Sequence, residues 1–158
     1  MNNLRAPLVV LDTNIALDWL VFIDGGMLHL PDAIETKAIT LLSTPATLAE
    51  LERVLNYKNF ALCTATQAEK LSRYTAICQP YSGGMRPLGY DKTIPRCRDR
   101  DDQIFLDLAV NAQAAVLASK DARVLATRGR MKVLGVEVMA PMAFEAWLIS
   151  LAEPSQQA

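Results

Sequence analysis

The chain has 158 residues, 51% hydrophobic and 21% charged, which is the composition of one globular domain and excludes an intrinsically disordered chain. Lysine and arginine total 16 against 17 acidic residues, so a net charge of −1 excludes a polycation that coats nucleic acid nonspecifically. Three cysteines without a CxxC pair exclude a disulfide framework and a cysteine-rich zinc site, and the single histidine, His29, excludes a histidine-rich metal cage and a paired-histidine acid–base scheme.

Short apolar runs alternate with longer segments of helical spacing, and this alternation predicts an α/β fold with a central parallel sheet. In chain order, we expect strands at 7–11, 38–43, 114–119 and 136–139. Helices are expected between and after them, at 12–22, 45–56, 66–78, 99–111, 121–128 and 141–151.

Capping residues mark two of the helix starts. Asn14 is the expected N-cap of the first helix. Thr44 followed by Pro45 is a stronger signal, because threonine caps a helix N-terminus and proline suits the first helical position. The second helix is therefore expected to begin directly after Thr44.

Two stretches lack a regular period. Gly25-Gly26 opens the first, and the second, 80–97, has three prolines and three glycines and is expected to be a loop with room for a short strand. No repeat, low-complexity tract or linker interrupts the chain. We therefore expect a single domain over 1–152, followed by a loose polar tail at 153–158.

The sequence predicts a cytoplasmic protein. An odd number of thiols fits a reducing compartment. The apolar run at 8–11 ends in Asp12 and is too short for a signal peptide, and no later apolar stretch approaches the length of a membrane span.

Four acidic residues are expected to converge at one edge of the sheet. Asp12 directly follows the first strand, and Asp121 lies two residues beyond the third. The carboxyl ends of parallel strands meet in one crevice, so both side chains should reach it. Glu50 in the second helix and Asp102 at the start of the fourth can join them.

Each of these acids also has a purely structural explanation. Asp12 and Asp121 could cap the helices that follow them, and Asp102 could complement a helix dipole. Glu50 could be a solvated residue that pairs with Arg53 one turn on.

Their combination favours a metal site. Two carboxylates about 4 Å apart repel by roughly 4 kcal/mol at an effective dielectric constant near 20, so four without cations would be costly. Carboxylate oxygens are ligands for the hard cations Mg²⁺ and Mn²⁺. Such ions can activate water and stabilise the leaving oxygen of an in-line phosphoryl displacement, chemistry that needs no histidine.

Four ordered blocks carry a family resemblance. They are VVLDTNIAL at 9–17, LAELERVL at 48–55, CRDRDDQIFLDLAV at 97–110 and VLASKDARVL at 116–125. Together they resemble a PIN domain, in particular the toxin components of toxin–antitoxin pairs. The resemblance extends from about Leu8 to Leu148 and includes a closing strand and helix.

The resemblance implies a three-layer α/β/α fold and assigns site residues. The metal-binding and catalytic acids would be Asp12, Glu50, Asp102 and Asp121, with Asn14 and Ser119 as supporting residues. Within the DRDD run Asp102 is chosen, because the family's acid lies three residues before a Phe-Leu pair that Phe105-Leu106 match. Asp99 is then the expected N-cap of the helix. The chain departs from the family pattern at Arg100, where proline is common, and at Arg123, where an acid is common. The segment 80–96 has no clear counterpart in the family.

The function implied is that of an Mg²⁺- or Mn²⁺-dependent endoribonuclease. The expected partners are an RNA substrate, an antitoxin protein encoded nearby and a second copy in a homodimer. Two alternatives stay open. One is a PIN-like scaffold that binds RNA or protein without catalysis, and the other is a haloacid-dehalogenase-type phosphohydrolase, although that family has a second aspartate where this chain has Asn14.

Charge is distributed unevenly along the chain. Between Gly84 and Lys132 there are ten lysines and arginines against six aspartates, a local net charge of +4, and the rest of the chain carries −5. This basic half suits a phosphate backbone, or it is a soluble surface with scattered arginines. Asp18 and Asp107 are expected to face solvent, His29 to be a surface or packing residue, and Trp19 and Trp147 to be core or dimer-contact residues.

Overall fold

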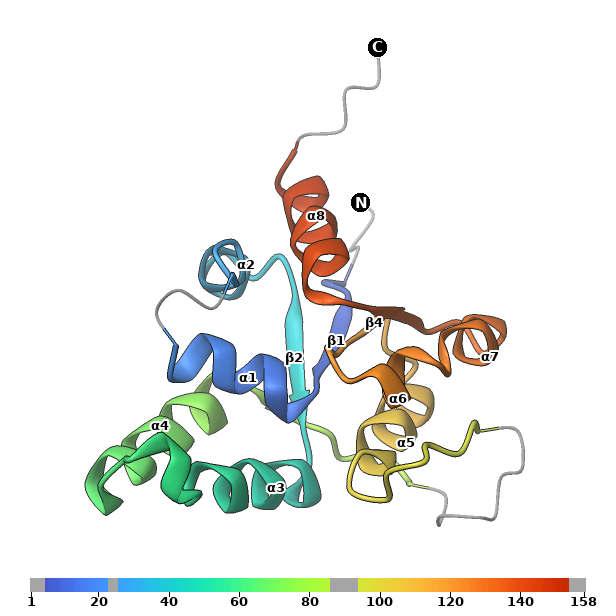
Figure 1. The fold of residues 1–158 in the computed structure, drawn as a ribbon. Coiled ribbons are helices and arrows are strands. Elements are labelled where there is room, and N and C mark those ends of the chain that lie inside the picture. The colour runs from blue at the N-terminus through green and yellow to red at the C-terminus, as the bar shows by residue number, and fades with distance from the viewer. Residues whose placement is uncertain (1–4, 23–25, 86–93, 154–158) are drawn as a thin grey trace.

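A central, all-parallel sheet organises the computed structural model, which describes residues 5–22, 26–85 and 94–153 (Figure 1). In the described residues the sheet has five strands in the order β3-β2-β1-β4-β5. They are β1 (Leu8–Leu11), β2 (Thr40–Ser43), β3 (Gln79–Pro80), β4 (Val116–Ala118) and β5 (Glu137–Met139). The four expected strands are present, and the edge strand β3 lies at the start of the stretch that was expected to be a loop with room for a short strand.

Helices cover both faces of the sheet and complete a three-layer α/β/α fold of the PIN-like type (Figure 1). One face is covered by α1 (Thr13–Leu20), α2 (Leu30–Glu35), α3 (Pro45–Leu55), α4 (Thr64–Ile77) and α8 (Pro141–Ala152). The other face is covered by α5 (Gln103–Asn111), α6 (Ala122–Leu125) and α7 (Arg128–Val133). A single turn of 3₁₀ helix, η1 (Lys58–Phe60), connects α3 to α4.

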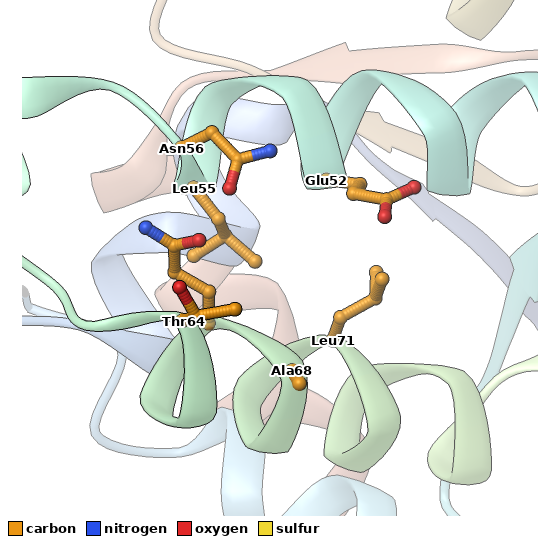
Figure 2. A pocket seen from close by; sticks show the side chains of 7 residues that line it. Glu52, Leu55, Asn56, Thr64, Ala68 and Leu71 are labelled. Atoms are coloured by element: carbon orange, nitrogen blue, oxygen red, sulfur yellow. The ribbon is translucent and has the colours of Figure 1, made fainter.

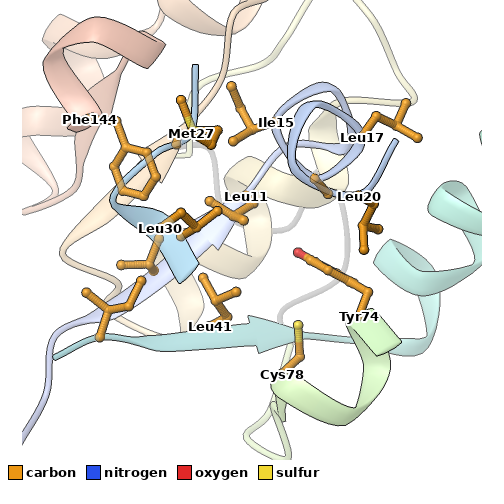
Figure 3. Close-up of a cluster of buried hydrophobic side chains, with 14 of the residues drawn as sticks. Leu11, Ile15, Leu17, Leu20, Met27, Leu30, Leu41, Tyr74, Cys78 and Phe144 are labelled. Atoms are coloured by element: carbon orange, nitrogen blue, oxygen red, sulfur yellow. The ribbon is translucent and has the colours of Figure 1, made fainter. Parts of the chain in front are cut away.

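The two central strands β1 and β4 consist of apolar residues, because they are buried on both faces. In β1, Val9 and Leu11 pack into the cluster beneath α1, α2 and α8, whereas Val10 points to the opposite cluster beneath α5. This alternation follows the period of two of a strand. Figure 3 shows Leu11 and Leu41 of the sheet beside Leu30 and Phe144 in the first cluster.

The start of α3 agrees with its sequence signal. Thr44 is the N-cap, its hydroxyl accepts the Thr47 N–H at 3.2 Å, and the Thr47 hydroxyl accepts the Thr44 N–H at 2.9 Å. Pro45 occupies the first helical position. The two reciprocal bonds satisfy N–H groups that have no partner within the helix, and they fix the helix that carries Glu50.

Two predicted N-caps are wrong. Asp12, whose backbone is extended, occupies the N-cap position of the first helix without a side-chain cap bond, and Asn14 lies inside the first turn. The fourth helix begins at Gln103, with Asp102 at the N-cap position, rather than at Asp99. The Asp99 carboxylate accepts the Asp101 N–H at 3.0 Å instead, because a short acidic side chain can bond nearby backbone and favour a turn over a helix.

Other differences concern short elements. Helix α2 lies in the stretch that was expected to be irregular, and the helix predicted at 121–128 is divided into α6 and the separate α7. Parts of the expected irregular stretches, 23–25 and 86–93, and nearly all of the expected tail, 154–158, lie outside the described residues. None of the helices in the described ranges combines the length and apolarity needed to cross a membrane.

Removing the α3 cap should destabilise the fold. We expect Thr44→Ala to lower the free energy of unfolding by about 1 kcal/mol, because the Thr47 N–H loses its acceptor. Urea unfolding measures the change. Thr75→Ala is the matched control, since the exposed Thr75 hydroxyl only bonds a carbonyl within α4, and equal losses in the two variants would contradict a capping role.

Candidate active site

The site begins where two neighbouring strands end. Leu11 of β1 pairs in register with Ala118 of β4, and the next residues along these strands are Asp12 and Ser119. The Asp12 N–H donates to the Ala118 carbonyl at 2.9 Å, which extends the pairing to the aspartate. Asp12 and Ser119 are therefore fixed side by side at the carboxyl edge of the sheet.

Ser119 links two of the predicted acids. Its hydroxyl donates to Asp12 Oδ2 at 2.6 Å and accepts the Asp121 N–H at 3.1 Å. The serine is fully buried, so these bonds do not compete with water. Asp121 in turn caps α6, because its Oδ1 accepts the Arg123 N–H at 2.7 Å. The capping role considered for Asp121 is confirmed, and the cap also holds its carboxylate beside Ser119.

Asp12 is a buried carboxylate, with 1% of its surface exposed. Burial raises its pKa above the ordinary value, and the charge of Asp121 raises it further, while the hydrogen bond from Ser119 opposes the shift. Asn14, the second supporting residue, is half-buried on the first turn of α1, and among the described residues its side chain forms no hydrogen bond to Asp12.

The Asp102 carboxyl is affected by the charges of the other predicted acids. Its pKa is raised to about 7, first by burial and then by the charges of Asp12, Asp121, Asp99 and Glu50. The repulsion shows that α3 and the start of α5 bring Glu50 and Asp102 within electrostatic range of the acids at the strand ends. The carboxylates of Asp12, Asp121, Asp99 and Glu50 thus all act on Asp102 through their charge, and these five residues define the acidic site.

Arg53 binds Glu50 through both carboxylate oxygens. Arg53 Nε donates to Oε2 at 2.9 Å and Nη2 donates to Oε1 at 2.7 Å. The same guanidinium lies 3.6 Å from Asp101, donates to the Tyr57 hydroxyl, and has its carbon 5.5 Å from the centre of the Tyr57 ring. The Glu50–Arg53 pair considered from the sequence is thus confirmed, at the border of the acidic site.

Asp18 and Asp107 are buried, so the expectation that they face solvent is wrong. Asp18, 8% exposed, accepts two bonds from Lys120 Nζ at 2.8 and 2.9 Å. Asp107 accepts a bond from Gln103 Nε2 at 3.0 Å. Both lie on helices that are apolar on nearly every side, and this apolarity is the signal that could have revealed their burial.

The Lys120–Asp18 pair adds a third constraint to the turn between β4 and α6. Ser119 is bound to Asp12, Lys120 to α1 through Asp18, and Asp121 to the backbone of α6. Each residue of this turn therefore has its own partner. The pairing of Lys120 with Asp18 was not predicted, because it joins positions 102 residues apart in the sequence.

The other residues considered from the sequence lie outside the acidic site. His29 is exposed, and its Nδ1 is 2.5 Å from Glu145 Oε2 of α8. Trp19 and Trp147 are partly buried against the first core cluster, as expected of packing residues. A shallow pocket between α3 and α4 contains none of the predicted acids (Figure 2), and it is lined by Glu52, Leu55, Asn56, Thr64, Gln67, Ala68 and Leu71.

The donor chemistry of the acidic site fits a hard divalent cation. It offers carboxylate oxygens that repel one another, and the adjacent Thr13 hydroxyl is buried without a hydrogen-bond partner in the described part of the chain. As placed, however, no three Asp, Glu, His or Cys side chains of the described residues are gathered closely enough to hold one ion. Ser119 and Arg53 hold Asp12 and Glu50 through bonds of their own.

Comparison with known proteins gives one match. A family model described as the PIN domain matches residues 8–123, which extend from β1 into α6 and include all four predicted acids. No curated protein and no solved structure matches the chain.

The raised pKa of Asp102 predicts a pH-dependent effect of its removal. A carboxyl with a higher pKa in the folded state binds its proton more tightly there, so the fold loses stability as pH rises from about 4 to about 7. Without divalent metal, Asp102→Asn should stabilise the protein at pH 8, on the order of 1 kcal/mol after solvent screening, and have little effect at pH 4.

Chemical denaturation at both pH values measures this difference. Glu69→Gln on the exposed side of α4 is the control for loss of a negative charge away from the site. A stabilisation by Asp102→Asn that is as large at pH 4 as at pH 8 would show that repulsion between carboxylates is not its cause.

Proposed function

This chain belongs to the PIN-domain family, and from that premise we propose that it is an Mg²⁺- or Mn²⁺-dependent endoribonuclease that hydrolyses RNA phosphodiester bonds. PIN domains have a nuclease-type fold. The observation that carries the proposal is the electrostatic coupling of Asp102 to Asp12, Asp121 and Glu50. Such a set of carboxylates can hold a metal that activates water without a catalytic histidine.

The four acids are the proposed metal ligands. Asp12, Glu50, Asp102 and Asp121 would hold the cation, with Ser119 orienting Asp12 through its hydrogen bond and Asn14 in support from the first turn of α1. When bound, Mg²⁺ or Mn²⁺ would supply a water of lowered pKa and stabilise charge on the leaving oxygen.

The protein itself positions these groups and attracts the substrate. Ser119 and the Lys120–Asp18 pair fix the turn that carries Asp121, so the acids at the strand ends keep their spacing. Of the expected basic half, Arg123 binds Asp99 at 2.9 Å and Arg98 and Arg100 lie in the same turn as Asp99, while Arg86 and Lys92 lie outside the described residues. These cations favour approach of a phosphate backbone in spite of the acids.

Unpaired RNA is the proposed substrate. An in-line displacement requires a phosphate that reaches into the acidic site, and unpaired backbone bends into such a site more easily than an A-form helix. The proposed biological role is that of the toxin in a toxin–antitoxin pair, opposed in the cytoplasm by an antitoxin protein encoded nearby. A homodimer is the proposed assembly.

The alternatives have less support. A scaffold that only binds RNA or protein has no need for four carboxylates, and this chain has acids at all four positions. The haloacid-dehalogenase reading is set aside, because the chain belongs to the PIN-domain family and Asn14 stands where that chemistry needs a second aspartate.

Cleavage of RNA tests the proposal. Purified protein with Mn²⁺ or Mg²⁺ should cut a single-stranded RNA, and EDTA should stop the reaction. Asp12→Asn and Asp121→Asn should each lower the rate at least about 100-fold, because a metal contributes several kcal/mol to stabilising the transition state. Asp32→Asn, on α2, is the control and should cleave at the unchanged rate.

A growth assay distinguishes the nuclease function from the scaffold function. Expression of the wild-type chain without an antitoxin should slow cell growth, and the Asp12→Asn protein should not. If the Asp12→Asn protein were equally toxic while inactive on RNA, growth arrest would come from binding, and the scaffold function would replace the nuclease.

A further inference from the structure

The guanidinium of Arg53 is held at the border of the acidic site by three different groups. Its Nε and Nη2 donate to the two oxygens of Glu50, at 2.9 and 2.7 Å, its Nη1 donates to the Tyr57 hydroxyl, and its Nη2 lies 3.6 Å from Asp101. The Tyr57 ring also lies beneath it, with 5.5 Å from the guanidinium carbon to the ring centre. Few rotamers satisfy all of these contacts, so the group is preorganised.

An ordinary surface ion pair does not account for this arrangement. A solvated pair three residues apart on a helix contributes a few tenths of a kcal/mol and needs no further partners. Here the Glu50 side chain is only 17% exposed, and its charge reaches Asp102, whereas the Arg53 side chain is 49% exposed. The acid thus faces the site, and the arginine is open to an approaching molecule.

The geometry points to a second role: we propose that Arg53 binds the phosphodiester backbone of the RNA substrate, and that Glu50 occupies its donor edge until substrate and metal are present. This inference rests on the proposed nuclease function. A guanidinium presents two parallel N–H groups that match a phosphate as well as a carboxylate, so the edge now bound to Glu50 can bind phosphate unchanged.

The exchange follows from competition for one carboxylate. Glu50 cannot give the same oxygens fully to both Arg53 and a divalent cation. When Glu50 turns to the cation, Nε and Nη2 of Arg53 lose their acceptors, while the ring and hydroxyl of Tyr57 still hold the guanidinium in place. A phosphate oxygen then restores the lost hydrogen bonds next to the acids.

Two effects of opposite sign are therefore expected from one substitution. In Arg53→Gln, Glu50 is freed, so Mn²⁺ should bind at least about 3-fold more tightly in calorimetry without RNA. The same variant should bind a fluorescent single-stranded RNA about 10-fold more weakly, measured by anisotropy with Ca²⁺ as the divalent ion. Neither measurement depends on turnover.

The salt dependence of RNA binding identifies a phosphate contact. Loss of one such contact should reduce the slope of log K against log salt by about 0.7 for a single strand. Arg53→Lys keeps the charge but not the paired donors, so it should retain the slope and recover only part of the affinity. Arg73→Gln is the matched control, because the guanidinium carbon of Arg73 on α4 lies 4.9 Å from the centre of the Trp19 ring on α1, and the variant should change neither Mn²⁺ nor RNA binding.

The outcomes distinguish this inference from the function on which it rests. If wild-type protein binds Mn²⁺ and RNA but Arg53→Gln behaves like Arg73→Gln, the role of Arg53 is overturned and the nuclease proposal stands. Equal losses in both arginine variants would mean general attraction by positive charge and would also overturn it. Absence of Mn²⁺ binding and of RNA cleavage in the wild type would overturn both proposals.

Discussion

Repulsion between carboxylates at one edge of the sheet is the constraint on which the rest of this site depends. Three of the four acids have a group that offsets their charge or fixes their position: Ser119 for Asp12, the Arg123 N–H for Asp121, and Arg53 for Glu50. Asp102 has no such hydrogen bond among the described residues, and its pKa is raised first by burial and then by the charges of the neighbouring carboxylates. The protein thus maintains an arrangement that a bound cation would stabilise.

The fold produces this arrangement from distant parts of the chain. Adjacent parallel strands place Asp12 and Ser119 together, the capped start of α3 leads to Glu50, and the turn before α5 leads to Asp102. Buried polar contacts keep these elements in place, as in the Lys120–Asp18 pair between the β4–α6 turn and α1. Packing therefore holds carboxylates close together although they repel one another, so the arrangement proposed for function lowers the stability of the fold at this edge of the sheet.

Much of this architecture is predictable because strong local signals agree with the global fold. The apolar strand preceding Asp12 could belong only to a buried sheet, and the Thr44-Pro45 pair specifies a helix start that the structure retains. The convergence of Asp12 and Asp121 follows from their positions after adjacent parallel strands. The expected helix positions already suggested that Glu50 and Asp102 could join them, and the family resemblance assigned the individual residues, including Asp102 within the DRDD run.

The errors arise where local chemistry competes with a helical pattern or where burial is decided by distant partners. Asp99 lies in a charged run that looks like a helix start, yet its carboxylate closes a turn and delays α5 until Gln103. Asp18 and Asp107 carry charge but lie on helices with almost no solvent-facing side. Lys120, the partner of Asp18, is 102 residues away in sequence and becomes apparent only in three dimensions, and so does the position of Arg53 at the border of the site, whereas Gln103 is only four residues from Asp107.

The most direct test of carboxylate repulsion is an NMR titration of the aspartate side-chain carboxyl carbons, with and without Mg²⁺. In metal-free protein the Asp102 carboxyl should titrate near 7, and saturating Mg²⁺ should move its pKa well below that value, because the cation compensates the neighbouring charges. An Asp102 carboxyl that titrates near its ordinary value of about 4 in both conditions would contradict the account, since the four acids would then not share one site.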